Sequence, residues 1–252
     1  MYQIKDGWMV FDVKFNEPLT NVVFPVGIRK IRFGCFFNQE MHNLPNSLTH
    51  LRFGYDFNQE VHNLPNNLTH LIFGACFNQE MHNLPNSLTY LTFGIKFNQN
   101  VNNLPNSLTH LKFGVKFNQE TRNLPNSLTH LTFGAYFNQD VSKLPNNLTH
   151  LTFGYKFNQD VSQLPNSLTH LIFDWKFNQD VNNLPKSITN LIFSGWPDSK
   201  FNHNLNPYLY HLTSFDIKNS HKHKRLMVER CQINQHNRGI REDKLIDLLL
   251  KN

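Results

Sequence analysis

The stretch FNQETRNLPNSLTHLTFG at residues 117–134 is one copy of a pattern that recurs along most of this 252-residue chain. The pattern F-N-Q-[EDN]-x-x-x-L-P-x-[SN]-[LI]-T-x-L-x-F returns every 20 residues without insertion or deletion. Its eight copies begin at Phe37, Phe57, Phe77, Phe97, Phe117, Phe137, Phe157 and Phe177. A unit two residues longer begins upstream at Phe15, and a shortened one begins downstream at Phe201. Such regular repetition is typical of a repeat architecture.

The end of the unit predicts a half-buried β-strand. Leu131 and Phe133 alternate with polar residues, which places both on one face of the strand. Pro125 fixes an extended or turn segment before the strand, and Gly134 ends the strand and lets the chain bend away. Because a 20-residue unit buries too little apolar surface to fold alone, we expect the units to stack as a parallel β solenoid. Short turns, extended segments or 3-10 turns are expected opposite the strands.

The segment LPNSLTHLTFG, followed closely by FNQ, resembles the FNIP repeat, a short relative of the leucine-rich repeat. The resemblance covers residues 15–215 and implies a leucine-rich-repeat-like solenoid without catalytic activity. Family members occur chiefly in amoebae and in giant viruses that infect them, and some carry an F-box. Only the unit at Phe15 has the usual family length. The 14 residues before Phe15 are too few for an F-box, so none is expected.

The pattern divides the chain into four segments. Residues 1–36 are expected to form an N-terminal cap and a diverged first repeat, and residues 37–196 the eight regular repeats. Residues 197–215 are expected to form a degenerate last repeat, and residues 216–252 a basic tail. The tail ends in REDKLIDLLL, whose leucines predict an amphipathic helix that either caps the last coil or docks onto a partner. The expected fold class is therefore a parallel β repeat solenoid with a C-terminal helical segment.

Positive charge is concentrated in the tail. The net charge is +6, and residues 200–252, with ten Lys/Arg and five Asp/Glu, carry +5 of it. Nucleic-acid binding is therefore expected only through the tail, and it stands as an alternative function. Three widely spaced cysteines, with no leader peptide and no membrane span, predict a reduced intracellular protein. We expect it in the cytoplasm, which would be that of the host cell if the protein is viral.

An asparagine follows the first phenylalanine of every unit. Turns between stacked coils must satisfy their backbone N–H and C=O groups, so we expect these amide side chains to bond neighbouring coils as a structural ladder. A ligand site is the less favoured interpretation. The predicted ladder comprises Asn38, Asn58, Asn78, Asn98, Asn118, Asn138, Asn158 and Asn178.

A histidine recurs at one outward-facing strand position. Neighbours in this column are expected about 5 Å apart. No carboxylate or cysteine shares the strand face, which favours surface strand residues over a protein-binding face and over a metal site. The column comprises His50, His70, His110, His130, His150 and His170, with Tyr90 and Asn190 replacing histidine in two units.

A second histidine group lies beside carboxylates in three consecutive units. This group forms either a carboxylate–imidazole patch for a metal or a column in which histidine relieves repulsion between glutamates. The second interpretation is favoured, and neither a metal site nor a cofactor is predicted. The pairs are Glu40 with His42, Glu60 with His62 and Glu80 with His82.

Contact positions in a solenoid are expected where the copies differ. The two positions after each strand vary, and aromatic and lysine side chains gather there in the later units. The predicted protein-binding strip comprises Tyr136, Tyr155, Lys156, Trp175 and Lys176. The alternative is that Trp175 packs against neighbouring coils.

No catalytic residues are predicted, because the chain has no nucleophile elbow, P-loop or Rossmann fingerprint. We therefore expect a non-enzymatic scaffold that presents one solenoid face to a protein partner of unknown identity. Resemblance to F-box relatives suggests a role in ubiquitination. Without an F-box, this chain would need another connection to the ubiquitination machinery. No membrane association is expected, and the alternative remains a nucleic-acid-associated protein that acts through its tail.

Overall fold

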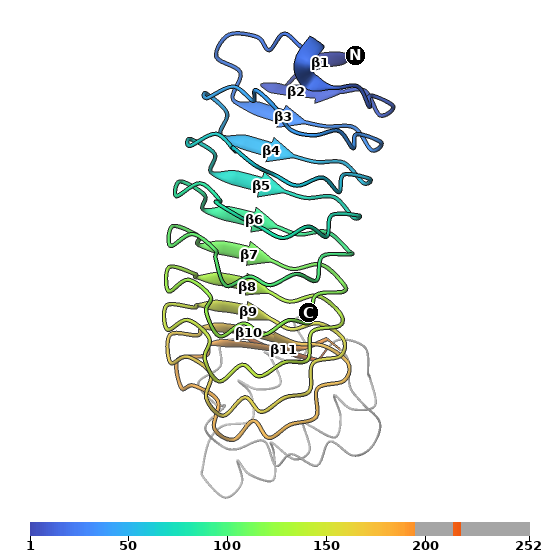
Figure 1. Cartoon of the computed structure of the whole chain (residues 1–252). Helices are drawn as coiled ribbons and strands as arrows, with labels where there is room; N and C mark the ends of the chain where they lie inside the picture. Colours follow the sequence, from blue (N-terminus) through green and yellow to red (C-terminus); the bar gives the residue numbers. More distant parts are fainter. Residues whose placement is uncertain (195–213, 218–252) are drawn as a thin grey trace, which may run out of the picture.

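The structure, a computed structural model, describes residues 1–194 and 214–217 (Figure 1). The chain winds as a solenoid whose strands form one 12-stranded sheet in chain order. The strands are β1 (Tyr2–Lys5), β2 (Trp8–Phe11), β3 (Lys30–Arg32), β4 (His50–Arg52), β5 (His70–Ile72), β6 (Tyr90–Thr92), β7 (His110–Lys112), β8 (His130–Thr132), β9 (His150–Thr152), β10 (His170–Phe173), β11 (Asn190–Phe193) and β12 (Ser214–Ile217). The only helical segment in these ranges is the 3-10 turn η1 (Leu19–Asn21). The predicted parallel β solenoid is confirmed, and the predicted C-terminal helix lies outside the described residues.

The register of the sheet follows directly from the repeat length. Strands β3 to β11 pair in parallel, and each strand residue faces the residue 20 positions further on, as His50 faces His70. Identical residues therefore form columns along the sheet. Strand β12 continues the parallel ladder, with Asn190 facing Ser214, so this strand extends beyond the boundary expected at residue 215.

The first coil begins with an antiparallel hairpin of β1 and β2. Asp6 and Gly7 form its turn with φ values of 51° and 77°, and positive φ at both central residues is what a tight two-residue hairpin turn requires. Strand β2 then pairs in parallel with β3. The Asp-Gly pair in the sequence is the signal for this hairpin, which the expectation of a general N-terminal cap did not include.

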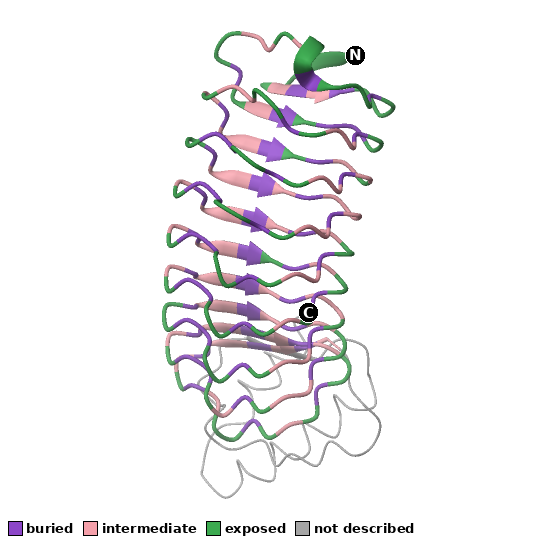
Figure 2. Cartoon of the chain, in the orientation of Figure 1, coloured by how far each residue is buried: buried purple, intermediate pink, exposed green. Residues whose placement is uncertain are grey.

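Buried positions recur in every coil of the solenoid (Figure 2), and two phenylalanines from each coil contribute the largest side chains of the core. The ring centres of Phe113 and Phe117 lie 3.6 Å apart within one coil. Each ring also stacks on its counterpart in the next coil, with Phe113 5.7 Å from Phe133 and Phe117 6.1 Å from Phe137. Leucines before and within each strand complete the layer, so every coil buries its apolar face against two neighbours.

The glycine after each strand is required by the closeness of the coils. A Cβ on Gly134 would lie 1.9 Å from the carbonyl oxygen of Gly114, which no side chain can approach so closely. We expected Gly134 because glycine lets the backbone bend freely. That reason is wrong, because none of the glycines that end strands has a positive φ. Asp174 and Ser194 replace glycine after β10 and β11, where the strands gain a fourth residue.

Thr121 is a local defect in the core. It occupies an inward position held by Met or Val in the other units, its side chain is 3% exposed, and its hydroxyl has no hydrogen-bond partner. We predict that Thr121→Val raises the free energy of unfolding by about 1–2 kcal/mol, because it removes an unpaired buried hydroxyl at constant volume. The reverse change Val141→Thr in the next coil should lower the free energy of unfolding. Urea unfolding measures both, and a less stable Thr121→Val protein would contradict the assignment.

Candidate interaction surface

The five residues of the predicted strip lie together on one edge of the solenoid, in the turns after strands β8, β9 and β10. Tyr136, Tyr155 and Trp175 are between 42% and 49% exposed. The ammonium group of Lys156 lies 4.0 Å from the ring centre of Tyr136, and that of Lys176 lies 5.2 Å from the ring centre of Tyr155. Cation–π contacts therefore join neighbouring coils and orient the exposed rings.

The same edge is apolar along most of its length, which sequence reasoning missed. Val13 is 55% exposed in the turn after β2 and Phe36 is 50% exposed in the turn after β3, and Tyr55, Ile95 and Val115 are exposed in turns that follow. Backbone bonds between coils hold the edge, as in the donation from the Lys156 N–H to the Ala135 carbonyl at 2.8 Å. Phe36 could have been found by extending the variable column back to the first units.

The histidine column forms a continuous stack on the strand face. Ring centres of His110 and His130, and of His130 and His150, lie 4.2 Å apart with nearly parallel planes. His150 and His170 are 4.1 Å apart, as are His50 and His70. Tyr90 occupies the gap between the two groups and stacks more loosely on both sides, at 5.4 and 5.7 Å.

A threonine precedes each of these histidines and fixes its ring. In the unit at His130, the Thr129 hydroxyl lies 2.9 Å from the ring nitrogen Nδ1 and 3.2 Å from the Thr109 carbonyl oxygen of the previous coil. The same pair of contacts occurs at all six histidines of the column. When the imidazole is charged, Nδ1–H donates to the hydroxyl, and the hydroxyl donates to the carbonyl, so protonation keeps the bond.

The histidine stack disfavours its own protonation. Partial burial lowers the pKa of His130, and the charges of His110, His150 and His170 lower it further. Partial burial and neighbouring cations likewise lower the pKa of His50, His70 and His150. Because the rings are parallel, their nitrogens point in the same direction and do not converge on one metal ion. The described residues also contain no group of three metal-ligating side chains.

Carboxylates lie on the side of the coil opposite the strand, because they are half of a 20-residue unit away from the strand in sequence. The His42, His62 and His82 rings contact their own unit's glutamates at 3.1, 2.7 and 3.4 Å. Each carboxylate is thus partnered within its coil. In later units the shorter Asp140 accepts bonds from the Ser142 N–H and hydroxyl, which lower the pKa of that carboxyl.

The asparagines of the predicted ladder bond one coil to the next. The Oδ1 atom of Asn118 accepts the N–H of Asn138 at 2.8 Å, and each asparagine from Asn38 to Asn158 does the same for its successor. Gln119 adds a bond from its side-chain amide to the Asn98 carbonyl at 3.1 Å. The asparagine side chains are half-buried or exposed, so these turns are less buried than expected.

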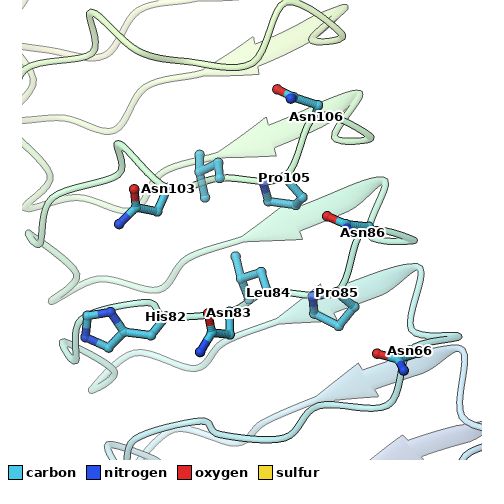
Figure 3. A pocket seen from close by; sticks show the side chains of 10 residues that line it. Asn66, His82, Asn83, Leu84, Pro85, Asn86, Asn103, Pro105 and Asn106 are labelled. Carbon is cyan, nitrogen blue, oxygen red and sulfur yellow. The ribbon is translucent and has the colours of Figure 1, made fainter.

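An open groove of about 550 Å³ lies on the segments before β6 and β7 and reaches Asn66 of the coil before β5 (Figure 3). It marks a change of turn geometry, since Asn83 has φ of 54° whereas Asn103 in the next coil has a negative φ. Amide side chains and two prolines line it, without a cluster of charge. The lining residues are Asn66, His82, Asn83, Leu84, Pro85, Asn86, Asn103, Leu104, Pro105 and Asn106.

Comparison with known proteins agrees with this geometry. Eight segments match the FNIP Repeat family, at residues 15–56, 37–76, 57–96, 77–116, 97–136, 117–156, 137–173 and 160–195. This chain belongs to the FNIP-repeat family. No curated protein matches it.

Two solved structures resemble the FNIP-repeat chain. CroV588, a circular leucine-rich-repeat protein from a giant virus, is 44% identical with a TM-score of 0.70 over 81% of this chain. The match covers 36% of CroV588, so this chain spans about a third of that protein. YopM from Yersinia enterocolitica WA-314 is 24% identical with a TM-score of 0.47, and the match covers 76% of this chain and 40% of YopM.

An FNIP-repeat solenoid has the architecture of repeat proteins that bind other proteins on an extended surface, and such proteins are generally non-catalytic. No helix among the described residues is long and apolar enough to cross a bilayer.

The asparagine ladder predicts a modest loss of stability on substitution. Asn118→Ala leaves the N–H of Asn138 without its acceptor, and we expect the free energy of unfolding to fall by about 0.5–1.5 kcal/mol. Asn126→Ala is the control, since Asn126 is exposed and its side chain makes no hydrogen bond in the described chain. Equal unfolding midpoints for the two variants would contradict a structural role for the ladder.

The histidine stack predicts that stability falls in mild acid. Because the folded pKa of His130 lies below its ordinary value of 6.5, this contribution to stability is complete above about pH 6.5 and is lost as the pH falls through the folded pKa. Thermal unfolding between pH 7.5 and 5 should show a falling midpoint, with a shallower fall for His130→Asn than for the parent. His62→Asn, on the opposite side, serves as the control. A His130→Asn protein with the parent's slope would contradict this account.

Proposed function

We propose that this chain is a non-enzymatic scaffold that binds another protein through the strip of Tyr136, Tyr155, Lys156, Trp175 and Lys176. The observation that carries the proposal is the exposure of three large aromatic side chains on three successive coils, two of them held by lysines. Exposed tyrosine and tryptophan contribute much of the binding energy at protein interfaces.

The strip is favourable for binding because little of it has to become ordered. Coil-to-coil backbone bonds fix its turns, and the lysine contacts orient Tyr136 and Tyr155 before a partner arrives. Preordered side chains reduce the entropy that association costs. The ring of Trp175 has no aromatic or cation contact within the described residues, so this side chain has the most apolar surface left for a partner to cover.

Family resemblance extends this proposal to ubiquitination, in which the bound protein would be a substrate or a component of that pathway. The alternative, nucleic-acid binding through the basic tail at residues 216–252, concerns a segment whose residues 218–252 lie outside the described residues. A full-length protein and a truncation after Ile217 separate these functions. Binding to nucleic acid that falls steeply with salt and disappears with the tail would support the alternative.

The strip is tested by single substitutions and affinity capture from the native cell extract, followed by mass spectrometry and a titration with the captured partner. Trp175→Ala is expected to weaken the captured partner's binding by at least about tenfold, as at an interface hot spot, with a smaller loss for Tyr155→Ala. Tyr55→Ala is the matched control, because Tyr55, at 55% exposed, is at least as exposed as Tyr155 and Trp175 at the same position of an early unit. Equal affinities for all three variants would contradict the strip as the binding site.

A further inference from the structure

From β3 to β11 the strand face carries only one sign of charge, whereas Asp216 on the last strand, β12, pairs with Ile192. Strands β3 to β11 contain no aspartate or glutamate, whereas Lys30, Arg32, Arg52 and Lys112 point outward from them beside the six stacked histidines. Seven acidic residues repeat on the other side of the coil, and two more, Asp56 and Asp174, lie in the turns after β4 and β10. The seven are Glu40, Glu60, Glu80, Glu120, Asp140, Asp160 and Asp180. The solenoid is therefore nearly neutral in sum but divided into a basic strand face and an acidic back.

We propose that this strand face binds an acidic segment of a protein partner, and that binding tightens as the histidine column gains protons. A carboxylate meets only attraction there, because every charged neighbour of the column on strands β3 to β11 is a cation, and the other neighbours are neutral Tyr90, Asn190, threonines and isoleucines. On β2, the neutral Trp8 ring packs against His50 at 5.9 Å. Charge complementarity of this kind gives both attraction and selectivity.

The ring geometry favours carboxylates over nucleic-acid bases. Both faces of His130 and His150 are covered by neighbouring rings about 4 Å away, so a base has no histidine face on which to stack. The ring edges remain available. Nδ1 contacts a threonine, and Nε2 of each column histidine makes no hydrogen bond among the described residues. A protonated Nε2–H is therefore free to donate to a carboxylate.

A bound acidic segment also removes the cost of protonation. Neighbouring imidazolium ions repel each other across the stack, and a carboxylate between their outer edges offsets that repulsion. Protons and the acidic segment therefore promote each other's binding, as reciprocal linkage requires. This surface is distinct from the aromatic strip, which lies beyond the ends of the strands, and it extends the proposed function to a second contact of defined chemistry.

The test uses a fluorescein-labelled octa-aspartate peptide and the full chain, with affinity measured by fluorescence anisotropy at pH 7.5 and 5.5 in the same salt. We expect binding roughly tenfold tighter at pH 5.5, from several exposed charge pairs of modest individual strength. The variant His110→Asn/His130→Asn/His150→Asn/His170→Asn should lose this gain, since asparagine already occupies the column at residue 190. His42→Asn/His62→Asn/His82→Asn, on the back, should retain it.

An equal gain in the column variant would overturn the proposal, as would loss of the gain in the back variant. Equally tight and equally pH-dependent binding of single-stranded oligothymidylate would overturn the assignment to an acidic protein segment. If the fourfold variant does not give the parent's circular dichroism spectrum, His130→Asn/His150→Asn replaces it. The Trp175→Ala variant should bind octa-aspartate as tightly as the parent does. This result separates a failure of the proposed binding strip from a failure of the proposed acidic-segment site on the strand face.

Discussion

Stacking of phenylalanine rings along the solenoid axis is the interaction on which the rest of the structure depends. Phe113 and Phe117 contact each other and their counterparts in the next coil, and this arrangement repeats along the chain. Rings that stack directly require coils of equal length and close approach. That approach excludes a Cβ after most strands, aligns Asn118 with Asn138, and brings the histidines into contact.

Because the coils align in register, a residue that repeats in every unit forms a continuous surface along the solenoid. A histidine or a glutamate that repeats every 20 residues becomes a row of identical side chains with small spacing, so its electrostatic effect is multiplied. The unit places histidine on the strand and a carboxylate half a coil away, and stacking converts this local arrangement into two faces of opposite character. Departures from the repeat, such as Tyr155 and Trp175, place exposed aromatic side chains on the edge after the strands, where the proposed strip lies.

Much of the fold could be predicted because the 20-residue period leaves few alternatives. Leu131 and Phe133 indicated the strand, and their repetition indicated a parallel ladder. Features that depend on distances between coils could not be obtained from the pattern. The reason for Gly134 is a carbonyl oxygen of the previous coil, and the half-burial of Asn118 depends on how the turns pack. The Asp6-Gly7 pair is a signal for the N-terminal hairpin, and it lies outside the repeat pattern.

Part of the candidate surface could also be predicted. Variation between copies indicated the five residues proposed as the strip, whereas the lysine–tyrosine contacts between them depend on side-chain directions. The outward histidine column was expected from alternation alone. Its direct ring stacking, and the contact of each ring with a threonine, depend on the distance between coils, which the pattern alone does not give.

The most direct test of this account is the thermal stability of Gly114→Ala beside Asp174→Ala. A Cβ on Gly114 would lie 1.8 Å from the Gly94 carbonyl oxygen, while Asp174 already carries a Cβ at the equivalent position. Close stacking predicts that Gly114→Ala lowers the free energy of unfolding by more than about 3 kcal/mol. Asp174→Ala should cost about 1 kcal/mol, from the lost bond to the Trp175 N–H. Similar, small losses in both variants would contradict coils held together by directly stacked phenylalanines.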